Sequence, residues 1–167
     1  MEAQTGTKKI LVAYFSQSGN TRSIARQIHQ KTGGDLFEIE RAIPYSQNYD
    51  TFAEEARREQ QQQARPALKN HVTNMAQYDV VFLGYPIWWS SIPMPVASFL
   101  EEYDFSGKTI IPFCSSGGGG SGRSRSVIAE LASRSTVAET FAVRTSGGPS
   151  LSNDISAWLR GNNIAEQ

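Results

Sequence analysis

Short apolar segments alternate with helix-forming segments five times along the chain, and this alternation restricts the possible fold more than any other feature. Near-continuous apolar runs at residues 10–15, 78–84 and 109–114 predict buried strands, and the patterns at 35–40 and 136–143 predict two more. Each is followed by residues whose apolar spacing is that of a helix with one buried face. Such alternation is typical of a parallel sheet covered by helices on both sides. The sequence therefore predicts an α/β fold with three layers.

The helix expected at residues 50–64 is more polar than the others. Only Phe52, Ala53 and Ala56 mark an apolar face, so we expect this helix on the surface. Pro66 ends it, because a residue that precedes proline avoids helical geometry. The other helices are marked by apolar residues or a starting proline, serine or asparagine: Ile24, Ala25 and Ile28; Pro93 or Pro95 with Val96, Phe99 and Leu100; Val127, Ile128 and Leu131; and Ser152 or Asn153 with Ile155, Trp158 and Leu159.

Three loops with unusual chemistry follow the carboxyl ends of the three most apolar strands. They cover residues 16–21, 85–91 and 115–122. In open parallel sheets, ligands bind outside the carboxyl ends of the strands, at the place where the strand order reverses. We therefore expect the three loops to form one ligand site.

The first loop carries three hydroxyl groups, on Ser16, Ser18 and Thr21, together with Gly19 and Asn20. A strand that ends in hydroxyls and leads into a helix can bind an anion, because the first N–H groups of the helix have no carbonyl partner. The alternative is an ordinary helix cap, but one hydroxyl would suffice for that. The loop contains no Lys or Arg, so it predicts a phosphate held by neutral donors.

The second loop is aromatic and the third is rich in glycine. Trp88 and Trp89 are adjacent, and adjacent side chains in extended or loop backbone tend to point apart. One tryptophan can fill the core while the other remains free to stack on a flat ligand. The glycines at 117–120 have no side chains that would keep a ligand from their backbone N–H groups. Together the loops indicate a site for a planar, phosphorylated heterocycle.

Composition restricts the class of protein further. The 167 residues predict a single domain, residues 1–167, in which residues 1–7 form a flexible N-terminal tail. Lys+Arg and Asp+Glu both number 16, so no basic excess indicates nucleic-acid binding. Residues 1–9 are polar and carry no apolar segment of the signal-peptide type, and the sequence has no metal-site motif and no apolar run near the roughly 20 residues of a membrane span. We therefore expect a cytoplasmic protein that does not bind membranes. The single cysteine, Cys114, excludes an internal disulfide. It is expected to pack as a small apolar residue, with a redox-active thiol as the alternative.

These motifs resemble the flavodoxin family, and specifically its bacterial members whose second loop reads Gly-Tyr-Pro-Ile-Trp-Trp, as residues 84–89 do here. Residues 16–21 match the family's phosphate loop, and the likeness covers nearly the whole chain in motif order. The resemblance implies a five-stranded parallel sheet of order 2-1-3-4-5, the short-chain form of the fold and a non-covalently bound FMN. The residues that it assigns to FMN binding are Ser16, Gln17, Ser18, Gly19, Asn20, Thr21, Tyr85, Pro86, Ile87, Trp88, Trp89, Ser115, Ser116, Gly117, Gly118 and Gly119.

The resemblance implies electron transfer through the flavin, with no catalytic side chain assigned. The electron-carrying members are usually acidic around the flavin edge, which steers them toward basic protein partners. This chain has zero net charge, and Arg123 and Arg125 follow the third loop. Two functions therefore stay open: a carrier that exchanges electrons with a redox partner protein, and an FMN-dependent reductase that uses NAD(P)H to reduce a small acceptor such as a quinone. A cofactor-free binding module is the third alternative, although such a module would not need the hydroxyl-rich loop.

Overall fold

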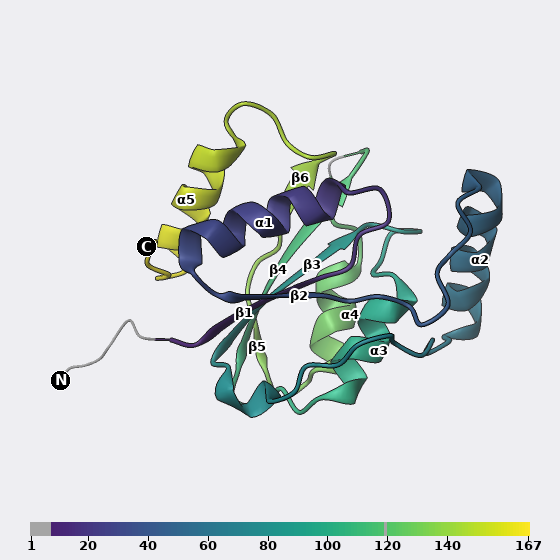
Figure 1. The fold of residues 1–167 in the computed structure, drawn as a ribbon, viewed down its shortest axis with the longest axis horizontal. Helices are drawn as coiled ribbons and strands as arrows, with labels where there is room; N and C mark the ends of the chain where they lie inside the picture. Colours follow the sequence, from purple (N-terminus) through teal and green to yellow (C-terminus); the bar gives the residue numbers. More distant parts are fainter. Residues whose placement is uncertain (1–7, 119) are drawn as a thin grey trace.

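The computed structural model describes residues 8–118 and 120–167, which fold into one parallel sheet flanked by helices (Figure 1). In chain order the elements are β1 (Ile10–Tyr14), α1 (Asn20–Thr32), β2 (Asp35–Glu38), α2 (Tyr49–Gln62), the 3-10 helix η1 (Met75–Gln77), β3 (Val80–Pro86), α3 (Met94–Glu102), β4 (Thr109–Ser116), α4 (Ser124–Leu131), β5 (Thr136–Val137), β6 (Phe141–Arg144) and α5 (Leu151–Gly161). The expected flexible tail at residues 1–7 and the expected FMN contact of Gly119 lie outside the described residues.

The strand order is β2-β1-β3-β4-β5, with β6 also paired to β4, and every pairing in the sheet is parallel. This confirms the predicted α/β fold and the predicted order. The order reverses next to β1, because β2 lies on one side of it and β3 on the other. The carboxyl ends of β1, β3 and β4 therefore lie side by side at one edge of the sheet.

The last strand, predicted as one segment over residues 136–143, is instead two short strands. Val137 pairs with Ile110, and the next pair is Phe141 with Phe113, so the edge strand carries one residue more than β4 does between these two pairs. Pro112 lies in this gap and explains it. The backbone bonds from Ala138 to Ile110 and from Thr145 to Ser116 show that even-numbered residues of β4 face the edge strand. Proline has no N–H to donate there, so the ladder is interrupted.

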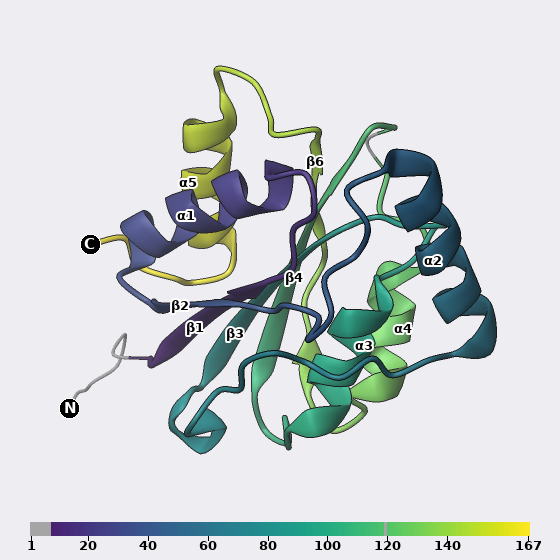
Figure 2. The same cartoon turned by 45° about the vertical axis from the view of Figure 1, so that its right-hand side comes forward.

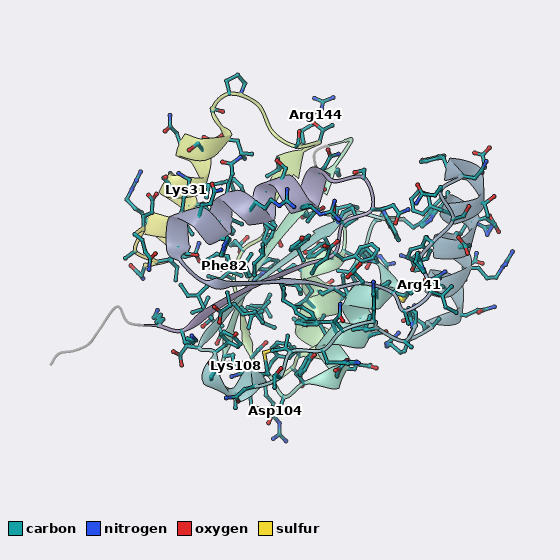
Figure 3. The ribbon with its side chains drawn as sticks, in the orientation of Figure 1. Lys31, Arg41, Phe82, Asp104, Lys108 and Arg144 are labelled. Carbon is teal, nitrogen blue, oxygen red and sulfur yellow. The ribbon has the colours of Figure 1, made fainter. Side chains whose placement is uncertain are left out.

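Two apolar layers cover the two faces of the sheet, because successive side chains of a strand point to opposite faces. On one side, Val12 and Phe82 pack against Ile24 of α1 and Ile155 of α5; Phe82 is labelled in this layer in Figure 3. The other layer joins the sheet to α3 and α4, through side chains such as Leu11, Leu83, Phe99 and Ile128. Figure 2 shows α1 and α5 together on one side of the sheet and α3 and α4 on the other.

The helix α2 stands at the side of the molecule, beyond the ends of the sheet strands (Figures 1 and 2). Ala56 is its one buried residue among those described, which agrees with the prediction of a surface helix. Asn48 caps its start, since the Asn48 side chain accepts a hydrogen bond from the Thr51 N–H. No helix in the described part of the chain has the length and apolar character that a membrane crossing requires.

Gly84 in β3 allows the Phe113 ring to pack directly against the strand, and its replacement provides a test of the fold. A Cβ placed at Gly84 would lie 2.2 Å from Cζ of Phe113, a ring that is itself fully buried. We expect Gly84→Ala to lower the free energy of unfolding by about 1–3 kcal/mol through overpacking. Gly161→Ala is the control, because a Cβ there meets no atom within 4 Å. Urea unfolding curves measure both, and equal stability of the two variants would contradict the packing of β3 on β4.

Candidate functional site

The three predicted loops meet around a cavity of about 450 Å³ at the carboxyl ends of β1, β3 and β4. This volume lies within the roughly 300–1,000 Å³ of small-molecule sites. The residues that line it are Gln17, Ser18, Asn20, Tyr49, Phe52, Ala53, Ala56, Pro86, Ile87, Trp88, Trp89, Ser115, Ser116 and Gly117. Ten of them were predicted from the sequence. The other four, all from α2, were not.

The first loop is built as a tight turn into α1. Gly19 precedes the helix with φ of +100°, a backbone conformation that glycine adopts without strain. The Ser16 hydroxyl accepts a hydrogen bond from the Gly19 N–H at 3.1 Å, which holds the turn closed. Thr21, in the first turn of α1, is buried, and its hydroxyl lies 2.8 Å from the Ser115 hydroxyl. This contact fixes the first loop, residues 16–21, to the end of β4.

No side chain that lines the cavity is an Asp, Glu, Lys or Arg, among the residues that the structure describes. The nearest cation in sequence is Arg22, which follows the first loop directly. Its guanidinium pairs with Glu38 at 2.6 Å, and Tyr14 donates a hydrogen bond to the other oxygen of the same carboxylate. The charge of Arg22 is therefore balanced by β2. An anion in the cavity would be bound by neutral donors: hydroxyl groups, the side-chain amides of Gln17 and Asn20, and the N–H groups at the start of α1.

The two tryptophans of the second loop point apart, as the sequence predicted. Trp88 packs among Phe15, Tyr45 and Phe52, with ring centroids at 5.3, 5.4 and 5.0 Å. Trp89 is 51% exposed at the mouth of the cavity. Trp88 thus joins the cavity to the core, and Trp89 presents a free aromatic face.

The backbone that carries Trp89 is strained. Trp89 and Ser90 have φ of +52° and +64°, and Trp88 and Ser91 exchange two backbone hydrogen bonds across them. This is the pattern of a two-residue type I′ turn, which usually has Asn-Gly at its centre. A side chain in this region costs about 1–3 kcal/mol per residue, so the surrounding structure must hold the turn in place.

The third loop contributes bare backbone. A Cβ built on Gly117 or Gly118 would meet no other atom of the protein within 4 Å. Packing within the described chain therefore does not require glycine at these positions. Their value at a binding site is that a ligand can approach the backbone closely.

The wall formed by α2 was missed in the sequence analysis. Tyr49, Phe52, Ala53 and Ala56 lie on one face of this helix and line the cavity opposite the loops. Phe52 and the alanines were recognised as an apolar face, but nothing in their spacing says that this face meets a ligand cavity instead of the core. Tyr49 is 73% exposed and contacts Phe52 edge-to-face, with ring centroids 5.6 Å apart.

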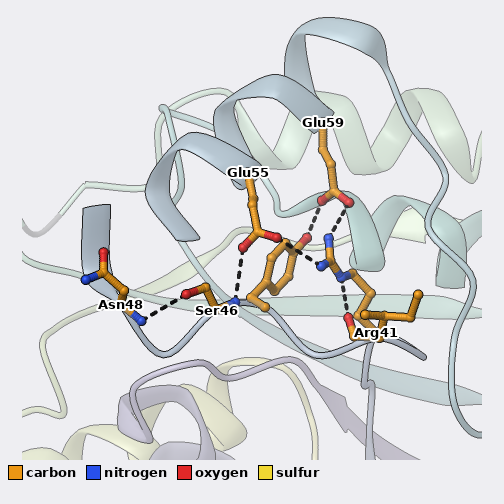
Figure 4. Close-up of polar contacts among 7 residues, drawn as sticks. Arg41, Ser46, Asn48, Glu55 and Glu59 are labelled. Atoms are coloured by element: carbon orange, nitrogen blue, oxygen red, sulfur yellow. Dashed lines mark hydrogen bonds and ion pairs between the residues drawn. The ribbon is translucent and has the colours of Figure 1, made fainter. Parts of the chain in front are cut away.

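A polar network anchors α2 to the connection that precedes it (Figure 4). Arg41 donates to Glu59 at 2.7 Å and lies 3.5 Å from Glu55, and its guanidinium stacks 3.7 Å from the centre of the Tyr45 ring. The Tyr45 hydroxyl also donates to Glu59, and Ser46 N–H donates to Glu55 at 3.0 Å. Burial, followed by the contact with Glu59, raises the pKa of Tyr45 well above its usual range. The network holds the wall of the cavity through charges that are mostly shielded from water.

Several predicted residues lie beside the cavity and do not line it. Tyr85 is fully buried, because β3 extends to Pro86 and strand alternation turns this side chain into the core, where its hydroxyl contacts Ser124. Ser16, Gly19, Thr21 and Gly118 are not part of the lining either. Cys114 is buried next to Tyr85 in the sheet, and burial raises the pKa of its thiol to about 12. It therefore packs as an apolar residue.

A second cavity of about 470 Å³ lies against β6 and the start of α5, and Arg144 and Asp154 are among its lining residues. It contains none of the residues that the sequence analysis selected. The cavity at β1, β3 and β4 is the stronger candidate, because it alone combines hydroxyl, aromatic and glycine loops.

Comparisons with known proteins agree with this geometry. A family model described as Flavodoxin matches residues 9–158. The crystal structure of a provisionally named flavoprotein from Bacteroides eggerthii superposes with a TM-score of 0.81 and 34% identity, covering 95% of this chain and 99% of that one. A similarly named protein from Bacteroides uniformis gives 0.80 and 28%, covering 89% and 98%. A Lactobacillus acidophilus flavoprotein crystallised in complex with FMN shares the fold, with a TM-score of 0.74 and 20% identity over 91% of this chain and 99% of that one. No curated protein matches the chain.

The anchoring of α2 can be tested with two substitutions that remove the same charge from the same helix. Glu59→Gln should lower the free energy of unfolding by about 2 kcal/mol, because a carboxylate hydrogen-bonded to Arg41 and Tyr45 is lost. Glu54→Gln is the control: its 3.8 and 3.9 Å contacts with Arg57 and Arg58 are solvent-exposed and contribute about 0–1 kcal/mol. Chemical unfolding measures both, and equal losses would show that the network does not hold the helix.

Proposed function

Because the chain belongs to the flavodoxin family, we propose that it binds FMN in the cavity at β1, β3 and β4 and transfers electrons through it. The observation that carries this proposal is the convergence of a hydroxyl-rich loop at a helix start with an uncharged, aromatic cavity. The two parts match the two ends of FMN, an anionic phosphate and a planar heterocycle.

The phosphate end is assigned to residues 16–21. The Ser18 hydroxyl, the Asn20 side chain and the first N–H groups of the 13-residue helix α1 supply neutral donors. The hydroxyls of Ser16 and Thr21 lie beside the cavity and hold the loop in shape through Gly19 and Ser115. Gln17 lies beside them in the lining. A phosphate dianion that is held by fixed neutral donors suits a cofactor that stays bound to the protein.

The ring end is assigned to the aromatic and apolar part of the cavity. Trp89 provides an exposed face for stacking, while Pro86, Ile87 and the α2 wall supply apolar contact. Gly117 and Gly118 carry no side chain, and the space where a Cβ would lie is open, so a ligand can approach their backbone closely. Ser115 and Ser116 end β4 and line the same cavity, so they are assigned to FMN contact as well.

FMN, when bound, supplies one- and two-electron chemistry that no side chain of this chain provides. The protein contributes binding, orientation and a local dielectric environment. The apolar wall of α2 and the Trp88 cluster exclude water from one side of the cavity. The uncharged lining adds no positive charge near the ring. These contributions set the reduction potential of the bound FMN. The redox partner would be another protein or a small molecule.

FMN titration of the apoprotein tests the site, with Trp89→Ala as the variant. Loss of one exposed stacking face should weaken FMN binding about tenfold, which corresponds to roughly 1.4 kcal/mol. Ile43→Ala is the control, because Ile43 is 75% exposed and lies outside the cavity lining. Flavin absorption bands from the purified protein and quenching of FMN fluorescence report binding. A wild-type chain that neither carries nor takes up FMN would overturn the proposal.

A second candidate function is reduction of a small planar acceptor such as a quinone. It is favoured by the mouth of the cavity, where Tyr49 and Trp89 expose two large aromatic rings and no described lining residue is acidic. Exposed apolar groups of this kind mark binding surfaces.

Steady-state assays with the FMN-loaded protein separate the two functions. NAD(P)H oxidation is followed with a quinone, with and without an added flavin reductase. A reductase should oxidise NAD(P)H on its own, and Tyr49→Ala should then raise its KM for the quinone several-fold. A carrier should turn over only when the separate reductase is present, and that outcome would remove the second candidate.

A further inference from the structure

The turn that carries Trp89 is the most strained segment of the described backbone. Five residues other than glycine have positive φ in the described ranges, and Trp89 and Ser90 are the only consecutive pair among them. Neither is an asparagine or a glycine, the residues that tolerate this conformation. A turn of this sequence keeps its geometry only when contacts from outside hold it.

Two outside elements hold the turn, one on each side. On the α2 side, the Gln60 side-chain amide donates to the carbonyl oxygens of both Trp88 and Trp89, each at 3.3 Å. On the α4 side, the Arg123 N–H donates to the Ser90 carbonyl at 2.7 Å. The backbone of Gly122 lies so close that a Cβ there would be 2.3 Å from the same carbonyl oxygen.

We propose that Gln60 is a positioning residue, which holds Trp89 at the mouth of the cavity by fixing the two carbonyl groups of the strained turn. A primary amide suits this task because its NH₂ group carries two donors, one for each carbonyl. Gln60 is absent from the cavity lining, so it acts on a ligand through Trp89. This inference rests on the proposed function for the identity of the ligand, FMN.

The neighbouring residue explains why α2 can serve as the fixed support. Glu59 is anchored to Arg41 and Tyr45, while Gln60 faces the turn. The two consecutive residues therefore link the connection before α2 to the second loop. Gln61 and Gln62, which follow, are exposed. Among the four consecutive glutamines at 60–63, Gln60 is the one that donates hydrogen bonds to the turn, whereas the Gln63 side chain donates to the Gln60 carbonyl.

The strain predicts a specific rescue. If Gln60 acts by stabilising positive φ at Trp89 and Ser90, glycine at position 90 should make the side-chain contact less necessary, since glycine adopts positive φ without a steric penalty. Ser90 is exposed and lies outside the cavity lining. Ser90→Gly therefore changes the turn and does not remove any of the contacts that are assigned to FMN.

The test compares Gln60→Met, Gln61→Met, Ser90→Gly and the double variant Gln60→Met/Ser90→Gly. Methionine keeps the length and the helix propensity of glutamine and removes both donors. FMN affinity is measured by fluorescence quenching. Amide hydrogen exchange of Ser91, whose N–H donates to the Trp88 carbonyl at 3.1 Å, is measured on the apoprotein.

We expect Gln60→Met to lower FMN affinity and the protection of the Ser91 amide about tenfold each. Gln61→Met should change neither. The double variant should return to within about threefold of Ser90→Gly alone. Wild-type behaviour of Gln60→Met, or a loss in Gln60→Met that Ser90→Gly does not restore, would overturn the positioning role.

The two readouts separate this inference from the proposed function. A wild-type protein that does not bind FMN refutes the proposed function, while the Ser91 amide still tests the hold of Gln60 on the turn. A wild-type protein that binds FMN, with Gln60→Met equal to it in both readouts, refutes the role of Gln60 alone. If Gln60→Met does not fold, Gln60→Glu replaces it with Gln61→Glu as its charge-matched control.

Discussion

The parallel pairing of β1, β3 and β4 is the constraint on which the site depends. It brings three loops that are far apart in the sequence to one edge of the sheet, because parallel strands end on the same side. The buried contact between the Thr21 and Ser115 hydroxyls then fixes the first loop to the end of β4. The strands on which the loops are built are packed in the core, so the first loop (residues 16–21) and the glycine-rich loop are held in fixed positions relative to each other.

The opposite side of the cavity is held in another way. The helix α2 buries little apolar surface, and polar contacts fix its position: Glu59 joins it to Arg41 and Tyr45, and Gln60 joins it to the strained turn at Trp89. Trp88 completes this side, since its ring packs between Phe52 and Phe15. The cavity therefore lies between a wall set by backbone pairing and a wall set by side-chain hydrogen bonds. The second wall is the one that substitutions of single residues can move.

Much of the architecture could be predicted from the sequence, because apolar runs and loop chemistry are local signals. The parallel α/β fold and the three loops follow from them, whereas the strand order was implied by the resemblance to the flavodoxins. The break opposite Pro112 could not be predicted, although proline is known to interrupt a ladder. Predicting it requires knowing that the missing N–H faces the edge strand and not β3. Tyr85 was assigned to the cavity by motif, whereas strand alternation places it in the core. Tyr49 and Gln60 could not be predicted, since their roles depend on where a polar surface helix docks, and that is decided by distant partners such as Arg41.

A crystal structure of the chain with FMN tests the central claim most directly, that the hydroxyl loop and the aromatic cavity form one cofactor site. The account predicts the FMN phosphate within hydrogen-bond distance of the N–H and hydroxyl groups of residues 16–21. It also predicts the flavin ring between Trp89 and the wall formed by α2. Density for FMN in the cavity beside β6 and α5, or a ring that does not touch Trp89 or α2, would contradict it.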